Sequence, residues 1–372
     1  MRDAEKRGWI ALQMVSGLGP VMGRRLIERF GSPEGVFSAT AEDLRCLPRL
    51  SDRVRQALTS GPDERKIEHS LAVMRRLGAW IITLHDPEYP IFLREIHDPP
   101  LCLYGCGDPG CLNRSGVAVV GSRRPTSYGL KIARVITADV ARAGIVIISG
   151  LAQGIDSVAH RSACEADGMT IAVKGCGIDV AYPRSNTELV KDIVRKGAVV
   201  TEFPVGTAPE PRNFPGRNRI ISGLSRGVLV VEAGLKSGSL ITASYALDQG
   251  RSVMAVPGSV VSPMSAGTHW LIKQGARLVD SATDVLDELG HPAMEDGPAP
   301  AAGGGGPGGS VPPDLSPEEL VIYEQLEDGP RHLDDLAHLT ALPVSRVSGL
   351  LMRMALKDAV RVLPGQCYQR NP

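Results

Sequence analysis

The stretch VAVVGSRRPTSYG, residues 117–129, decides the fold of the middle of this chain. It opens with four apolar residues, three of them β-branched, and passes through a Gly-Ser loop into LKIARVITADVARAG at residues 130–144, which has helical periodicity. Short continuous apolar runs are typical of strands buried on both faces, as in parallel sheets. The stretch therefore predicts a strand, a tight loop and a helix, in that order.

The same pattern recurs along the middle of the chain. Each apolar run is followed by a loop rich in Gly or Ser and then by a helical stretch. The predicted strands are Val117–Val120, Ile145–Ile148, Thr170–Val173, Ala198–Thr201, Val228–Val231 and Ser252–Val256. Strands that alternate with helices indicate an α/β protein with a doubly wound, Rossmann-like and mostly parallel sheet. The carboxyl ends of its strands form one edge, where ligands bind in such folds.

The loop after the first predicted strand suits an anion. Gly121 and Ser122 precede a helix, whose N-terminal N–H groups and dipole favour negative charge. Arg123 and Arg124 add two guanidinium groups, and segment 114–134 holds five basic residues and no acid. The loop has neither the GxGxxG pattern of dinucleotide sites nor a Walker A motif. A phosphate-facing loop is therefore favoured over a solvated turn.

Other strand ends carry residues of the same kind. The candidates are Gly154 in SGLAQGID, Arg184 in YPRSN, Phe214, Arg217, Asn218 and Arg219 in FPGRNRIISG, and Ser237, Gly238 and Ser239 before a later helix. These loops outnumber what one mononucleotide needs, so they indicate an extended groove for a phosphate chain, which single-stranded nucleic acid fits. The aromatic residues available for stacking in these loops are Tyr128, Tyr182, Phe203 and Phe214.

Within FPGRNRIISG, we expect the isoleucines to anchor a helix whose N-terminal turn holds Arg217 and Arg219 toward the nucleic acid. Replacing either arginine with Ala should then weaken binding.

Acidic residues near these loops favour structural roles. Asp156 and His160 are spaced i, i+4 and could form an acid–base pair. An N-capping Asp with a surface His is the favoured interpretation. Glu202 and Glu232 end strands and could be catalytic, although a carboxylate that holds an arginine in place is the more common use.

The ends of the chain predict separate modules. Residues 1–65 are helical, with a Gly17-Leu18-Gly19 turn typical of a SAM or helix-hairpin-helix domain, and residues 66–290 form the extended Rossmann-like domain. Residues 291–314 are mostly Gly, Ala and Pro and predict a flexible linker. Residues 315–372 indicate three helices and a hairpin, as in a winged helix. Eight acids against six bases there favour a protein-contact or accessory role over DNA binding.

Composition limits the remaining possibilities. Basic and acidic residues balance at 41 each, so an anion site depends on local placement rather than on net charge. No apolar run approaches the ~18 residues of a membrane span, and we expect a cytoplasmic protein with no membrane partner. Seven cysteines, an odd number, favour free thiols. A metal held by Cys102, Cys106, Cys111 and His97 fits no common zinc spacing, and we expect no metal and no cofactor.

Taken together, the motifs resemble the DNA-processing protein A (DprA/Smf) family. VAVVGSRRPTSYG, SGLAQGIDSVAH, TIAVKGCGIDVAYPRSN, FPGRNRIISGLSRGVLVVEAGLKSGSLITA, GRSVMAVPGS and GTHWLIKQGA occur in that order over about 115–290. The resemblance implies a non-enzymatic, dimeric single-stranded DNA-binding protein that loads the RecA recombinase on incoming DNA in natural transformation. It implies RecA and dimer surfaces within about 230–285. The DNA-pocket positions that it implies are Gly121, Ser122, Arg123, Gly154, Arg184, Arg217, Asn218 and Arg219.

The chain departs from the family pattern at Lys174, Thr201 and His269, none of which alters the arginines. Two other classes stay open. One is a Rossmann-like hydrolase that cleaves nucleoside monophosphates, for which Glu232 has a suitable position. The other is a transcription regulator that acts through the winged helix. The acidic charge of the winged-helix module weakens this second interpretation.

Overall fold

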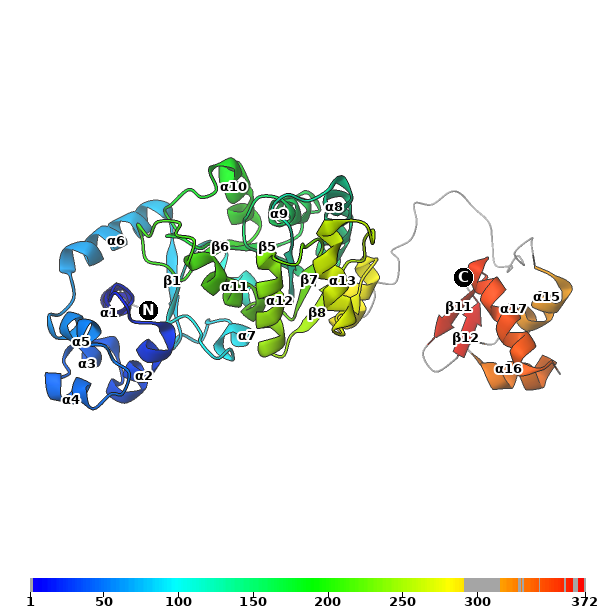
Figure 1. Cartoon of the computed structure of the whole chain (residues 1–372), viewed down its shortest axis with the longest axis horizontal. Helices are drawn as coiled ribbons and strands as arrows, with labels where there is room; N and C mark the ends of the chain where they lie inside the picture. The colour runs from blue at the N-terminus through cyan, green and yellow to red at the C-terminus, as the bar shows by residue number, and fades with distance from the viewer. Residues whose placement is uncertain are drawn as a thin grey trace. The chain divides into compact units, whose positions relative to one another are not determined.

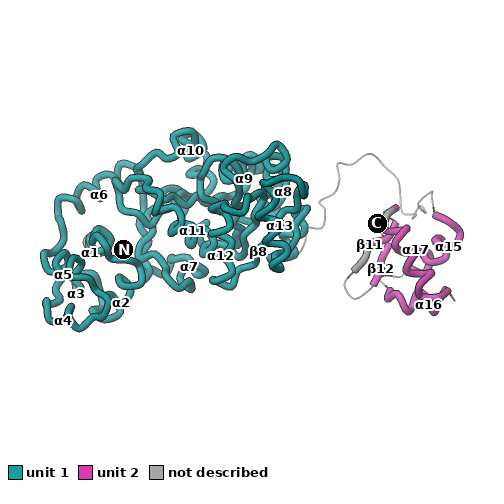
Figure 2. Tube along the Cα trace, viewed as in Figure 1, with its two compact units in different colours: residues 1–295 teal, residues 296–372 magenta. Residues whose placement is uncertain are grey.

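The computed structural model describes residues 3–290, 315–326, 329, 331–340, 342–357, 359–363 and 367–370. They fall into two compact units, residues 1–295 and residues 296–372 (Figure 2). The predicted linker, 291–314, lies outside the described residues. No helix in the described ranges has the length and apolar character needed to cross a membrane.

A nine-stranded sheet forms the centre of the first unit (Figure 1). Its strands are β1 (Trp80–Thr83), β2 (Cys102–Gly107), β3 (Gly116–Val120), β4 (Val146–Ser149), β5 (Thr170–Val173), β6 (Ala198–Thr201), β7 (Gly227–Val230), β8 (Ser252–Ala255) and β9 (Arg277–Leu278). They lie in the order β1-β2-β6-β5-β4-β3-β7-β8-β9. β1 and β2 are antiparallel to their neighbours, and the other pairs are parallel. The chain thus winds outward from β3 in both directions, which confirms the doubly wound, mostly parallel sheet.

The continuous apolar runs predicted the strands correctly because hydrophobic cores cover both faces of the sheet. The six predicted strands are β3 to β8, each within one residue of the predicted bounds. In β3, Val117 and Val119 pack in one core, whereas Ala118 and Val120 pack in another. Alternate residues of a strand point to opposite faces, so each face of this strand lies in a hydrophobic core.

Helices follow the strands along the chain and cover the sheet. They are α8 (Ser127–Arg142), α9 (Ile155–Glu165), α10 (Thr187–Lys196), α11 (Asn213–Gly223), α12 (Gly238–Asp248), α13 (Ala266–Lys273) and α14 (Ala282–Glu288). Residues of α8, α9 and α14 share one core, and residues of α11, α12 and α13 share the other.

The N-terminal helices pack against the β1–β2 side of the sheet. They are α1 (Asp3–Gln13), α2 (Pro20–Phe30), α3 (Pro33–Phe37), α4 (Ala41–Arg45), α5 (Asp52–Thr59) and α6 (Glu64–Leu77), and the short α7 (Ile91–Arg94) precedes β2. One hydrophobic core includes Ile10 and Leu26 of these helices together with Tyr104 of β2 and Val199 of β6. The N-terminal helical layer therefore shares its core with the sheet.

The second unit has a winged-helix arrangement, as predicted. It contains α15 (Pro317–Glu324), β10 (Arg331–His332), α16 (Leu333–Thr340), α17 (Val344–Leu356), β11 (Val360–Leu363) and β12 (Cys367–Arg370), with antiparallel strands in the order β10-β12-β11. Ser316 and Glu319 cap α15 reciprocally. The predicted hairpin turn at Pro364-Gly365 lies outside the described residues.

Cys46, Cys102, Cys106, Cys111, Cys164 and Cys176 are free thiols. In the part of the chain that the structure describes, no three His, Cys, Asp or Glu side chains gather as a metal site requires.

Candidate functional site

A cavity of about 690 Å³ lies at the carboxyl ends of β3 and β7. These adjacent strands are where the winding direction reverses, which is the usual ligand position in a doubly wound fold. Nine predicted site residues line the cavity: Gly121, Ser122, Arg123, Phe214, Arg217, Asn218, Ser237, Gly238 and Ser239. The remaining four, Arg124, Gly154, Arg184 and Arg219, do not line it.

The loop after β3 forms one wall, and Gly154 sets its position. The Ser122 amide donates to the Glu232 carbonyl at 2.7 Å, and the Ser122 carbonyl accepts from the Ile155 amide at 3.1 Å. Gly154 has φ +85°, and a Cβ there would lie 2.3 Å from the Ser122 carbonyl oxygen. Gly154 therefore lets two strand-end loops meet without lining the cavity itself.

Phe214 is the centre of an aromatic and cationic cluster. Its ring centroid lies 5.5 Å from that of Tyr182, and the guanidinium carbons of Arg123 and Arg217 lie 5.7 and 5.9 Å from it. A Cβ on Gly175 would lie 2.9 Å from the ring, so the backbone approaches the aromatic face closely. The cluster offers an aromatic surface for stacking with two positive charges close to it.

Lys174 supports the loop that carries Tyr182. Its Nζ is buried and donates to the carbonyls of Gly177, Ile178 and Val180 at 3.0, 3.0 and 2.6 Å. Position 174 departs from the family pattern, in which an apolar residue is more usual. Here its lysine donates hydrogen bonds to three loop carbonyls, which an apolar side chain could not do.

Arg217 places a buried positive charge at the cavity. Its Nη1 donates to the Gly150 carbonyl at 2.6 Å and to the Val173 carbonyl. Among the described residues no carboxylate accepts a hydrogen bond from it, and its Nε has no partner. Burial lowers the pKa of Arg217 to about 10, so the group stays charged at neutral pH. Asp156, which also lines the cavity, offsets part of this charge, but with Arg123 and Lys236 the lining carries a net positive charge.

The start of α12 forms the opposite wall. Ser237 caps this helix, with its Oγ accepting from the Ser239 amide at 3.3 Å. Asn218 bridges the walls by donating from Nδ2 to the Gly238 carbonyl at 3.2 Å. The exposed Lys236 also lines the cavity, although the sequence analysis did not select it. Its position directly before Ser237-Gly238-Ser239 could have identified it from the sequence. The helix N-terminus and Lys236 both favour an anion here.

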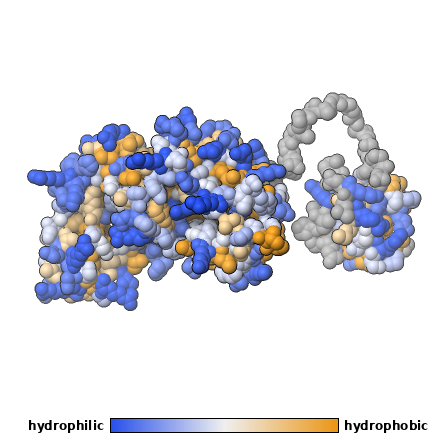
Figure 3. Space-filling view, turned by 45° about the horizontal axis from the view of Figure 1, so that its top comes forward, coloured by the Kyte–Doolittle hydropathy of each residue, from blue (hydrophilic) through white to orange (hydrophobic). Residues whose placement is uncertain are grey.

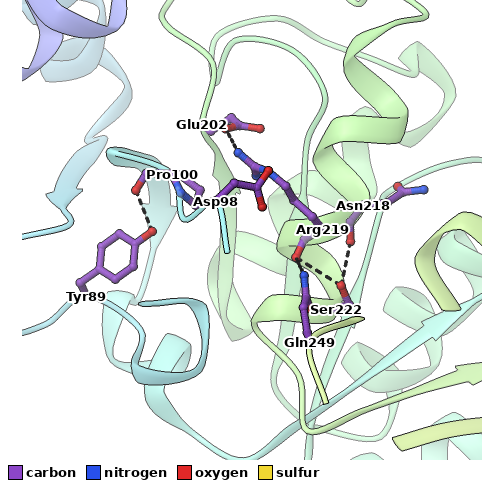
Figure 4. Close-up of polar contacts among 8 residues, drawn as sticks. All are labelled: Tyr89, Asp98, Pro100, Glu202, Asn218, Arg219, Ser222 and Gln249. Atoms are coloured by element: carbon purple, nitrogen blue, oxygen red, sulfur yellow. Dashed lines mark hydrogen bonds and ion pairs between the residues drawn. The ribbon is translucent and has the colours of Figure 1, made fainter. Parts of the chain in front are cut away.

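Arg219 lies away from the cavity, in buried ion pairs (Figure 4). Its Nε donates to Asp98 at 2.9 Å and its Nη2 to Glu202 at 2.6 Å, and the residue is 4% exposed. Residues two apart on a helix point about 200° from each other, so Arg217 and Arg219 face opposite sides of α11. Through these ion pairs, Arg219 joins α11 to the end of β6 and to the segment before β2.

Asp156 and His160, for which the sequence left an acid–base pair open, have different hydrogen-bond partners. The Asp156 carboxylate accepts from the Gly150 and Ala152 amides at 3.1 and 3.3 Å. His160 is buried rather than on the surface, and its Nδ1 lies 2.7 Å from Thr170 Oγ1. Burial lowers the pKa of His160 to about 3, so the ring is neutral. Asp156 lines the cavity, but its carboxylate fixes the loop after β4.

The strand-end glutamates have different roles. Glu202 holds Arg219, which is the arginine-holding use favoured from the sequence. Glu232 accepts from the Thr126 amide at 2.8 Å and from Thr126 Oγ1 at 2.5 Å, at the N-terminus of α8. The anion at this helix start is thus the protein's own carboxylate.

The structure distributes the other predicted residues differently. Arg124 and Arg184 are exposed. Of the four candidate stacking aromatics, Tyr182 and Phe214 line the cavity, whereas Tyr128 and Phe203 do not. The loop after β6 contributes Pro209 and Pro211, for which the sequence carries no clear signal.

A doubly wound sheet with a basic, aromatic cavity at its switch point, joined to a winged-helix module, defines a class of nucleic-acid-processing proteins. The chain belongs to the family of DNA recombination-mediator protein A, whose profile matches residues 80–290. The profile of the DprA winged helix domain matches residues 307–366.

Relatives and solved structures agree with this assignment. The protein Smf of Synechocystis sp. is 34% identical over 398 residues and covers 100% of both chains. The DNA processing protein DprA of Bacillus subtilis is 40% identical over 71% of this chain and 90% of its own. The X-ray structure of DprA from Streptococcus pneumoniae is 36% identical, with a TM-score of 0.68 over 76% of this chain and 97% of that chain. The structure of DNA processing protein A from Helicobacter pylori is 30% identical, with a TM-score of 0.51 over 56% of this chain and 95% of that chain. That structure concerns the single-stranded DNA binding mode of the Helicobacter pylori protein.

Proposed function

We propose that the chain is a cytoplasmic, non-enzymatic recombination mediator that binds single-stranded DNA in the cavity at β3 and β7 and loads RecA on it. The Phe214 cluster carries the proposal, because it pairs a stacking surface with two guanidinium groups. Nonspecific single-strand binding requires that combination. The structure of the Helicobacter pylori relative, which concerns its single-stranded DNA binding mode, supports the same ligand.

The proposed protein contacts have support from exposed apolar residues within 230–285. These are Leu235, Ile241, Leu247, Val260, Val261, Trp270 and Leu278. Figure 3 shows hydrophobic side chains gathered at the end of the first unit that carries α13. Large exposed apolar side chains that gather on a surface mark protein contacts, and we assign dimerisation and RecA binding to this region.

The hydrolase alternative loses its candidate carboxylate. Glu232 is 2% exposed, accepts two hydrogen bonds from Thr126 and does not line the cavity. Asp156 does line it, but its carboxylate is committed to two loop amides. Both carboxylates are thus engaged by the protein itself, which supports the non-enzymatic proposal.

Titration with single-stranded DNA, duplex DNA and nucleoside monophosphates at several salt concentrations tests DNA binding. We expect salt-dependent preference for single strands, and Arg123→Ala or Lys236→Ala should flatten the salt slope by about 0.7 per lost phosphate contact. Arg161→Ala, an exposed arginine on α9 outside the cavity, is the control. Release of a nucleobase together with weak DNA binding would support the hydrolase instead.

RecA loading needs its own measurement. Substoichiometric protein should shorten the lag of RecA filament formation on single-stranded DNA. An unchanged lag, with DNA binding intact, would remove RecA from the proposal and leave the DNA contact standing.

A further inference from the structure

A second groove, of about 800 Å³, lies between the N-terminal helical layer and the sheet edge. Its walls are the end of α1 with the following turn, the start of α6, and the loop after β6. The lining residues are Gln13, Met14, Val15, Ser16, Gly17, Leu18, Asp63, Arg65, Lys66, His69, Ser70, Phe203, Pro204, Val205 and Thr207. We call it the N-terminal groove.

Helix α6 directs the basic side chains of its first two turns to this groove. Arg65, Lys66 and His69 line it, whereas Glu64 and Glu68 form ion pairs with Arg7 of α1. The only acid among the lining residues is Asp63, which lies 3.2 Å from Lys66. Arg53 adds another guanidinium at the turn, where its Nη2 donates to Ser16 Oγ at 3.2 Å. The groove therefore carries net positive charge, although the whole chain is neutral.

The N-terminal groove lies on the same sheet edge as the central cavity. Its loop follows β6, and the cavity loops follow β3 and β7, which are parallel to β6 within one sheet. Three steps separate β6 from β3 in the order of strands, so their ends are about 15 Å apart at ~4.8 Å per strand. This distance is short enough for one nucleic-acid strand to reach both sites.

A smaller cavity, of about 370 Å³, adjoins the N-terminal groove, and its two acids, Asp98 and Glu202, are paired with Arg219. It shares Gln13, Leu18, Phe203 and Pro204 with the N-terminal groove and reaches Gly216 and Arg219 of α11. The neighbouring residues of that helix, Pro215 and Asn218, line the central cavity.

We propose that the N-terminal groove is a second nucleic-acid contact, which holds the backbone of a single strand after it leaves the central cavity. The inference rests on the proposed DNA-binding function. Arg65 and Lys66 neutralise phosphates, and Phe203, Met14 and Leu18 provide an apolar surface for bases. The positive charge of the groove and its place on the same sheet edge, about 15 Å along the order of strands, favour DNA over an acidic peptide as the occupant.

The test uses the full chain and fluorescent oligothymidylates of increasing length, with Arg65→Ala/Lys66→Ala as the variant. The shortest oligonucleotides occupy the central cavity, so wild type and variant should bind them equally. Longer ones should bind wild type more tightly, and the variant should lose that gain. Its salt slope should flatten by up to about 1.4, or 0.7 for each of two phosphate contacts.

Arg76→Ala is the matched control, because Arg76 is an exposed arginine on the same helix outside the groove. Equal behaviour of the variant and this control at every length would overturn the second contact while leaving the central cavity as a DNA site. Failure of Arg123→Ala to weaken the short oligonucleotides would instead contradict the proposed function. If polyglutamate binds wild type but not the variant, and length dependence is unchanged, the groove takes an acidic protein and the inference is wrong.

Discussion

Two glycines control how the side chains of the cavity sit on the sheet edge. A Cβ on Gly150 would lie 2.4 Å from Arg217 Nη1, and one on Gly175 would lie 2.9 Å from the Phe214 ring. Neither glycine has a φ that excludes other residues, so space rather than backbone conformation requires them. The proposed binding surface therefore depends on the lack of a Cβ at these two glycines as much as on the arginines.

Gly175→Ala should lower affinity for single-stranded DNA because the methyl group displaces the Phe214 ring. The expected loss is about 1 kcal/mol, roughly fivefold, at the low end for stacking one base. The salt slope should stay unchanged, since no phosphate contact is removed. Gly216→Ala is the control. Gly216 lies on the same helix as Phe214, and a Cβ on Gly216 would meet nothing within 4 Å. Equal affinities for both variants would show that the ring position is unimportant.

Arg219→Ala should act on stability, in contrast to Arg217→Ala, which should act on binding. Removing Arg219 leaves Glu202 and Asp98 without their cation, and breaking a buried ion pair costs about 3–5 kcal/mol. Urea unfolding should show this loss, and the folded variant should keep the wild-type salt slope for DNA. A flattened slope at unchanged stability would mean that Arg219 contacts phosphate after all.

At the level of elements, helix α11 shows what the sequence could not reveal. Apolar runs located β3 to β8 because burial on both faces leaves a continuous signal. The start of α11 carries no such signal: its N-cap is Arg212, which makes no side-chain capping bond, and Pro215 lies within its first turn. A Pro-Gly pair usually marks a turn, so the predicted helix began later than the observed one. The two arginines were therefore assigned to one face, although they lie on opposite faces.

In the winged-helix module, basic residues on or next to the long helix α17 form ion pairs with acidic residues of α15. Arg346 lies 2.7 Å from Glu318, and Arg353 and Lys357 lie 3.3 and 2.9 Å from the buried Glu319. Burial alone would raise the pKa of Glu319, but hydrogen bonds from Lys357, the Ser316 amide and Arg353 outweigh it and hold the pKa at about 2. The carboxylate therefore stays charged in acid as long as the module is folded.

Acid should destabilise this module through Glu319. The unfolded chain binds the proton near the ordinary pKa of 4.5, whereas the folded state resists it until about pH 2. The contribution to stability is thus full above about pH 5 and is lost as the pH falls toward 2. Calorimetry should show Glu319→Gln lowering the transition of the module at pH 7, with the gap to wild type narrowing by pH 3. A gap that is constant with pH would contradict the assignment.

At the scale of the whole molecule, the anion-binding features concentrate in the first unit. Its cavity and N-terminal groove hold Arg123, Arg217, Lys236, Arg65 and Lys66. The second unit is acidic by sequence, and Arg346, Arg353 and Lys357 on or next to α17 are engaged by its own carboxylates. This distribution favours a protein partner for the winged helix.

A chain shortened to residues 1–295 should therefore keep its affinity for single-stranded DNA and its salt slope. Comparing salt titrations of the short and full chains measures this directly. A slope flatter by about 0.7 or more in the short chain would place a phosphate contact in the winged helix.

The core shared by the N-terminal helices and the sheet has a consequence for how the first unit comes apart. Ile10 and Leu26 pack in the same apolar cluster as Tyr104 and Val199, so detaching the helices would expose strands of the sheet to water. Loss of that burial makes partial opening about as unfavourable as opening the strands themselves. Amide protons of α1 and of β6 should accordingly exchange with solvent in one cooperative event.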